Sequence, residues 1–263
     1  MKRIKNILII LLALAFHLFL TTPLFGGTDG ETHSLFFMVM SGIDPDMGAC
    51  ARRLCLGAMD FVIIGVAMLL MHPAKEIFGE LGLARRTCLR GLAIGFLLTL
   101  PMFITNAVCG KFIFTWETVF LSFWAGFYEE ILFRGFLFGQ LFRSGRLGFF
   151  TAILLPSLLF GMCHLYQSND LMSALLTVAV TALGSLLFGW LYVEWNYSLW
   201  VPMSLHAFMD LSWTLFPVGV GGYGATGNIT VNIGRAITVI LAVVITIMNK
   251  KKQGRKCFDY KKF

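Results

Sequence analysis

Long apolar runs dominate this 263-residue chain and leave few folds open to it. A helix that crosses a bilayer needs about 20 mostly apolar residues. Hydrophobic side chains make up 57% of the sequence and charged ones only 13%, an excess that one water-soluble core cannot bury. The chain is therefore expected to be an all-α, polytopic membrane bundle of about eight transmembrane helices. The predicted spans are residues 6–25, 56–72, 91–109, 115–143, 147–165, 171–193, 198–215 and 233–249.

Basic residues set the expected orientation in the cell membrane. Most of the 21 Lys and Arg residues fall at the N-terminus, in alternate loops and in the C-terminal tail. Because cytoplasmic segments are enriched in these residues, we expect both termini in the cytoplasm. The net charge of +7 is thus explained by membrane orientation rather than by nucleic-acid binding. The predicted organisation is N-terminal transmembrane helices (1–114), a core segment (115–215), and a last helix with a basic tail (216–263).

Ionisable side chains inside the apolar stretches are few and therefore informative. In lipid such a group is costly unless it is paired, hydrated or facing a cavity. Two of them, His17 and Asp60, have no partner in the predicted scheme and are assigned structural roles. The other six lie in three stretches: Glu129, Glu130, Arg134, His164, His206 and Asp210.

The first of these stretches carries two adjacent carboxylates. Glu130 and Arg134 are four residues apart with the acid first, the favourable order for an ion pair within a helix. Pairing of Glu130 would leave Glu129 about 100° around the helix, free to face another group. The alternative is an ion-paired helix end at the membrane surface. It is disfavoured because the apolar run continues from Phe136 to Phe142.

The other two stretches carry histidines. His164 ends an apolar helix, where a lone histidine is more often an interfacial residue than a catalyst. His206 and Asp210 are four residues apart, so they share one helix face, as in a catalytic or metal-binding pair. A pair that only locks two helices together stays an open alternative. Positions along the predicted helices allow one water-containing pocket that includes Glu129, with His206 fitting least well in depth.

Three motifs together resemble those of the CPBP intramembrane proteases. They are Glu-Glu-x-x-x-Arg at residues 129–134, Phe-x-x-x-His at 160–164 and His-x-x-x-Asn/Asp at 206–210. This family includes the type II CAAX prenyl endopeptidases and bacterial proteins linked to bacteriocin processing and self-immunity. The resemblance covers about residues 115–212. It implies an intramembrane endopeptidase that hydrolyses a peptide bond of a membrane-associated or lipidated peptide or protein.

The resemblance also implies a role for each motif residue. Glu129 would activate the attacking water with help from His164, and His206 with Asp210 would stabilise the oxyanion. Asp210 stands where many members have Asn, and an ionised Asp beside an oxyanion is unfavourable. We therefore expect Asp210 to be protonated, paired with His206, or acting as a ligand. Glu130, which is counted with the catalytic residues, and Arg134 are expected to hold Glu129 in place. Arg134 and Phe160 are the supporting residues of the site.

The cofactor stays open at this point. The family is commonly called a metalloprotease family, yet its architecture has also been interpreted as that of a metal-free glutamate protease. If a divalent metal is present, zinc fits best, held by Glu129, His164 and His206. The sequence has no His-Glu-x-x-His helix, the usual compact zinc device, and this favours a metal-free site.

Two other classes of function are also considered. A membrane scaffold or bacteriocin self-immunity protein could use the same fold to bind a peptide without cleaving it. A transporter would use the buried carboxylates and histidines as a proton relay, but the sequence lacks the inverted repeats expected of one. The expected partners are a peptide or lipidated protein substrate in the membrane, the lipid bilayer, and components of peptide secretion or quorum sensing. No nucleic acid is expected.

Overall fold

The structure is a computed structural model that describes residues 1–23, 25–26, 32–168, 170–218 and 229–258. In this part of the chain the only strands are a two-residue antiparallel pair, β1 (Phe25–Gly26) and β2 (Thr32–His33). The predicted all-α class is therefore confirmed. Contacts divide the chain into two compact units, Met1–Ile77 and Phe78–Phe263.

The first unit is built on two long helices with a short one between them. These are α1 (Lys2–Thr21), α2 (Leu35–Ile43) and α3 (Ala49–Met71). α1 packs against α3, where His17 Nδ1 lies 2.6 Å from Asp60 Oδ1. The two residues left without partners in the sequence analysis thus pair with each other, which offsets the cost of placing Asp60, 1% exposed, in an apolar helix.

Six helical segments of the described chain are long and apolar enough to cross a membrane. Two predicted spans are not among them, for clear physical reasons. The segment Trp116–Arg143 contains the charged residues Glu129, Glu130 and Arg134. α10 (Trp200–Leu215) has only 16 residues. The membrane bundle is confirmed, while the count of eight and the orientation of the termini stay predictions. The six segments that are long and apolar enough to cross a membrane are Lys2–Thr21, Ala49–Met71, Ala74–Cys109, Phe149–Gln167, Leu171–Glu194 and Ile229–Lys252.

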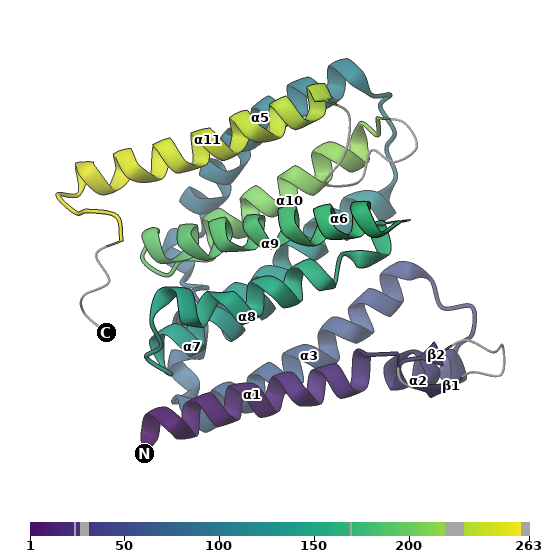
Figure 1. Cartoon of the computed structure of the whole chain (residues 1–263), viewed down its shortest axis with the longest axis vertical. Helices are drawn as coiled ribbons and strands as arrows, with labels where there is room; N and C mark the ends of the chain where they lie inside the picture. Colours follow the sequence, from purple (N-terminus) through teal and green to yellow (C-terminus); the bar gives the residue numbers. More distant parts are fainter. Residues whose placement is uncertain (24, 27–31, 169, 219–228, 259–263) are drawn as a thin grey trace. The chain divides into compact units, whose positions relative to one another are not determined.

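The second unit consists almost entirely of helices. In it α10 packs against both α5 and α6, α11 lies along α5, and α8 lies along α9 (Figure 1). The helices after α3 are α4 (Ile77–Glu80), α5 (Cys88–Cys109), α6 (Trp116–Glu129), the π-helix η3 (Glu130–Phe138), α7 (Gly139–Arg143), α8 (Phe149–Met162), α9 (Leu171–Glu194), α10 and α11 (Ile229–Lys252). Single 3-10 turns occur at η1 (Ala74–Glu76), η2 (Arg85–Thr87) and η4 (Leu165–Gln167).

The helix predicted to run unbroken through residues 115–143 changes its winding at Glu130. Thr115 caps the start of α6 by accepting a hydrogen bond from the Thr118 backbone N–H at 3.0 Å. Residues 130–138 then form a π-helix, and all nine of its residues are buried. Such π segments are rare and occur frequently at functional sites. The sequence predicted one continuous helix here, and that prediction is corrected.

The segment after α11 folds back onto the end of α9. Lys250 Nζ lies 3.2 Å from Glu194 Oε2, and the Phe258 backbone N–H donates to Glu194 Oε1 at 3.0 Å. Arg255 donates to Asn196 Oδ1 at 2.8 Å. The start of the predicted basic tail is therefore attached to the bundle. Residues 219–228 and 259–263 of the predicted third segment lie outside the described residues.

Small residues allow α5 to approach α10 closely. Gly91 lies against Trp200, and Gly95 lies against Ser204 and Leu205. This is the close helix contact expected of a Gly-x-x-x-Gly pair in a membrane protein.

We expect Gly95→Ala to destabilise the protein, because the added Cβ would lie 2.6 Å from the Leu205 backbone nitrogen. Overpacking of this kind costs about 1–3 kcal/mol. The matched control is Gly65→Ala in α3, where nothing lies within 4 Å of the added Cβ and the better helix former should not lower stability. The measurement is the unfolding midpoint in detergent. Equal midpoints for the two variants would contradict the close contact.

Candidate active site

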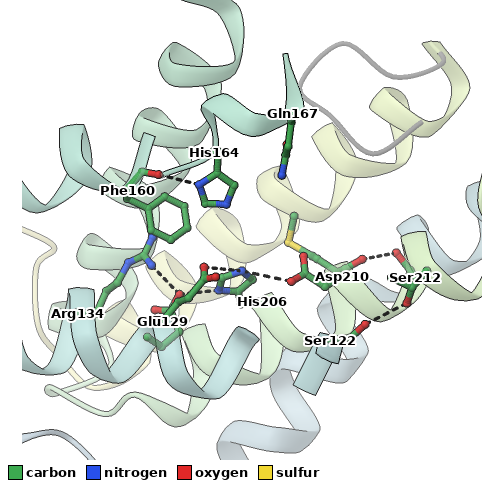
Figure 2. A network of polar contacts seen from close by, with 12 residues as sticks. Ser122, Glu129, Arg134, Phe160, His164, Gln167, His206, Asp210 and Ser212 are labelled. Carbon is green, nitrogen blue, oxygen red and sulfur yellow. Dashed lines mark hydrogen bonds and ion pairs between the residues drawn. The ribbon is translucent and has the colours of Figure 1, made fainter. Parts of the chain in front are cut away.

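His206 is the centre of a polar cluster inside the second unit (Figure 2). Its Nδ1 lies 2.9 Å from Glu130 Oε1. Its Nε2 lies 3.5 Å from Asp210 Oδ2 and 3.9 Å from Glu129 Oε2. Three carboxylates therefore surround one imidazole, and four of the predicted site residues are brought together.

Close packing of α6 on α10 brings the acids to His206. A Cβ on Gly126 would lie 2.6 Å from the Ala207 backbone nitrogen, so glycine is needed for the two helices to come this close. Glu129 follows Gly126 along α6, and His206 adjoins Ala207, so both side chains stand at the helix crossing. The prediction that His206 fits the pocket least well is therefore wrong.

The predicted ion pair between Glu130 and Arg134 is confirmed. Arg134 Nη1 donates to Glu130 Oε1 at 2.8 Å, and the two side chains are 2% and 0% exposed. The same carboxylate oxygen contacts His206 Nδ1. Because an ionised carboxylate can only accept, His206 Nδ1 carries a hydrogen and donates it. This contact fixes the ring and turns Nε2 toward Glu129 and Asp210.

Two phenylalanine rings enclose Arg134 and His206. Arg134 Cζ lies 4.3 Å from the Phe160 ring centroid and 5.4 Å from that of Phe188, within cation–π range. The His206 ring centroid lies 6.2 Å and 5.6 Å from the same two centroids. Phe160 was expected in a supporting position. Phe188 of α9 was missed, because a phenylalanine in an apolar helix carries no sequence signal of its own.

His164 stands at the edge of the cluster, just after the end of α8. Its Nδ1 lies 2.7 Å from the Phe160 carbonyl oxygen, which can only accept, so Nδ1 donates. In the neutral ring Nε2 is then an acceptor. Figure 2 shows the His164 ring and the Gln167 side chain on the same side of Glu129, His206 and Asp210. Among the described residues His164 forms no hydrogen bond to the three carboxylates.

Exposure separates the cluster into two parts. Glu129 is 22% exposed, Asp210 28% and His206 13%, so a substrate could reach them. Glu130 is completely buried and is not accessible to a substrate. Glu129 Oε2 is covered and has no hydrogen-bond partner in the described part of the chain. This oxygen is therefore an acceptor that the described part of the protein leaves unused.

The predicted metal ligands do not form a metal site as they stand. Within the residues that the structure describes, no three or more His, Cys, Asp or Glu side chains are grouped so that they could hold a metal ion. His206 and His164 each donate through Nδ1 to the protein, to Glu130 and to the Phe160 carbonyl, which leaves both Nε2 atoms outside these contacts. As the described side chains stand, however, Glu129, His164 and His206 are not grouped closely enough to hold zinc.

Comparison with known proteins identifies the class of this molecule. Residues 99–212, which include the whole His206 cluster, match the model of a membrane-embedded protease family. The family is described as "Rce1-like: Type II CAAX prenyl endopeptidase Rce1-like", and this match over less than half of the chain supports membership of the CPBP family. The predicted resemblance and the membrane location are confirmed. No curated protein and no solved structure matches the chain.

Proposed function

We propose that this chain is an intramembrane endopeptidase that cleaves a membrane-associated or lipidated peptide or protein. One observation carries the proposal. Glu129 Oε2 has no hydrogen-bond partner among the described residues and lies 3.9 Å from His206 Nε2. This separation is too long for a direct hydrogen bond and suits a water molecule bound to both atoms.

Glu129 acts as the general base. A water bound to Glu129 Oε2 transfers a proton to the carboxylate while its oxygen attacks the scissile carbonyl carbon. The carbonyl π electrons move to oxygen and form a tetrahedral oxyanion. When the C–N bond breaks, Glu129 returns the proton to the leaving amine. His164, whose Nδ1 is held by the Phe160 carbonyl, orients the water through Nε2.

His206 stabilises the oxyanion in its doubly protonated form, in which Nδ1–H donates to Glu130 and Nε2–H is the donor to the oxyanion. The contact from Nδ1 to Glu130 holds the ring, so little reorganisation is needed when charge develops. Asp210 lies 3.5 Å from Nε2, which favours the expectation that it pairs with His206. Low dielectric in the membrane strengthens each of these interactions. Because Glu130 is buried and away from substrate, we assign it, with Arg134, as a positioning residue.

The test is to compare peptides released from cell-derived membranes by the purified protein and by Glu129→Gln, each with and without chelator. We expect new peptide termini from the wild type alone, and we expect them to persist with chelator because the donor set does not fit a metal. Identical peptide profiles would overturn the proposal and leave a binding role, such as a scaffold or self-immunity protein. Loss of cleavage with chelator would contradict the metal-free site and leave the peptidase intact.

Phe188 is expected to position His206 and Arg134. Phe188→Leu keeps an apolar side chain but removes the ring, and we expect kcat to fall about tenfold with KM unchanged. Phe188→Tyr should restore the rate, since it restores an aromatic face. The control is Phe138→Leu, an equally large change at a ring that stacks with Phe142 and meets Phe149 edge-on. A similar fall in kcat for both Leu variants would indicate a general packing effect instead.

A further inference from the structure

A polar cavity lies in the first unit, at the start of α3. It has a volume of about 400 Å³, within the range of small-molecule sites. α3 begins before the predicted start at residue 56, so Arg52 and Arg53, expected in a loop, lie in its first two turns. The cavity combines these two arginines with apolar walls. Its lining residues are Phe36, Met47, Ala49, Arg52, Arg53 and Leu56.

Arg52 is held by contacts to the protein, and neither arginine is neutralised. Neither forms an ion pair within the described part of the chain. Arg52 Nη2 donates to the Met47 carbonyl at 3.0 Å, and its Cζ lies 5.3 Å from the Phe37 ring centroid. The covered Arg52 Nε has no hydrogen-bond partner among the described residues. A buried guanidinium donor without an acceptor is costly, so an external acceptor would be stabilising here.

The start of α3 adds to the positive potential of the cavity. The helix has no side-chain cap at Gly48 and no acidic residue in its first turn. The first backbone N–H groups of a helix carry a partial positive charge. The preceding loop contains Asp44 and Asp46, where Asp44 Oδ1 accepts from the Asp46 backbone N–H at 3.0 Å. In the described chain neither of them pairs with the arginines.

The cavity lies where lipid headgroups are expected. α3 has 23 residues, a length of about 34 Å at 1.5 Å per residue. The hydrocarbon core of a bilayer is about 30 Å thick, so the first turn of α3 reaches the headgroup layer. The neighbouring α2 has the apolar sequence LFFMVMSGI and no buried residue. In a membrane protein such a helix is covered by lipid.

We propose that this cavity binds the phosphate of an acidic phospholipid headgroup. Arg52 and Arg53 contact the phosphate oxygens with their guanidinium groups, which suit planar bidentate contacts to phosphate. Phe36, Met47 and Leu56 contact the glycerol and the upper part of the acyl chains. The site belongs to the first unit and does not depend on peptidase activity in the second.

The test is native mass spectrometry of the full-length protein in micelles that contain either phosphatidylglycerol or phosphatidylcholine. We expect the wild type to retain phosphatidylglycerol in preference to phosphatidylcholine. We expect Arg52→Gln/Arg53→Gln to bind it about tenfold more weakly. The matched control is Arg85→Gln/Arg86→Gln, which removes the same charge from another adjacent pair and should leave binding unchanged.

A conservative pair separates loss of charge from loss of fold. Arg52→Lys/Arg53→Lys keeps both charges and should retain preferential binding of phosphatidylglycerol. Equal retention of the two lipids by the wild type, or equal weakening by the two glutamine pairs, would overturn the proposal. Displacement of phosphatidylglycerol by excess inorganic phosphate would also overturn it and assign the cavity to the free anion.

Discussion

Glu129→Gln is expected to lower kcat for peptide cleavage by about 1,000-fold, with the fold intact. Glutamine keeps the shape of the side chain and can still bind water, but it cannot take a proton from it. A positioned general base typically contributes about 10²–10⁴-fold to a rate. The measurement is kcat and KM for a peptide cleaved in proteoliposomes, with the unfolding midpoint measured on the same preparation.

The matched control for this variant is Glu117→Gln. It makes the same chemical change on the same helix, at an exposed residue in the first turn of α6. We expect Glu117→Gln to keep the wild-type rate. If Glu129→Gln kept more than a tenth of the wild-type kcat, Glu129 could not be the general base.

The second large effect is expected for stability. Arg134→Met would leave Glu130, which is 0% exposed, as a buried carboxylate without its main counter-charge. Removing one partner of a buried ion pair costs about 3–5 kcal/mol. Methionine has a similar length and no charge, so the loss should come from electrostatics rather than from a large cavity. The measurement is the free energy of unfolding in mixed micelles.

Two further variants make this prediction specific. In Glu130→Gln/Arg134→Met both charges are gone, and we expect much of the lost stability to return. Arg143→Met breaks the pair of Arg143 with Glu80, whose side chains are 18% and 26% exposed. A partly solvated pair is worth less, so its loss should cost less. Equal losses for Arg134→Met and Arg143→Met would contradict the importance of burial.

The sequence predicted those features that depend on local spacing or on total composition. The membrane bundle follows from the apolar excess, which is independent of how the helices pack. The contact between Glu130 and Arg134 follows from their four-residue spacing, because residues four apart lie on the same face of a single helix. The four-residue spacing of Gly91 and Gly95 likewise indicates a close helix contact, although not which helix makes it.

The features that were missed depend on how helices cross. His17 and Asp60 are 43 residues apart, and nothing local in the sequence identifies them as partners. The depth of His206 was estimated along separate straight helices, whereas the contact between Gly126 and Ala207 fixes it. The π-helix has no known signature in a run of apolar residues, so the sequence could not predict it.

The unusual winding of residues 130–138 affects how related chains should be aligned. A π-helix closes its hydrogen bonds five residues back, so it contains in effect one residue more than an α-helix of the same path. Deleting one residue from 135–138 should therefore restore α-helical winding and leave α7 in its present orientation. Gln140 and Arg143 would then keep the Glu80 carbonyl oxygen, to which they donate at 3.1 Å and 2.6 Å. A one-residue gap here would mark a relative that keeps the acidic motif and this anchor but has an ordinary α-helix between them.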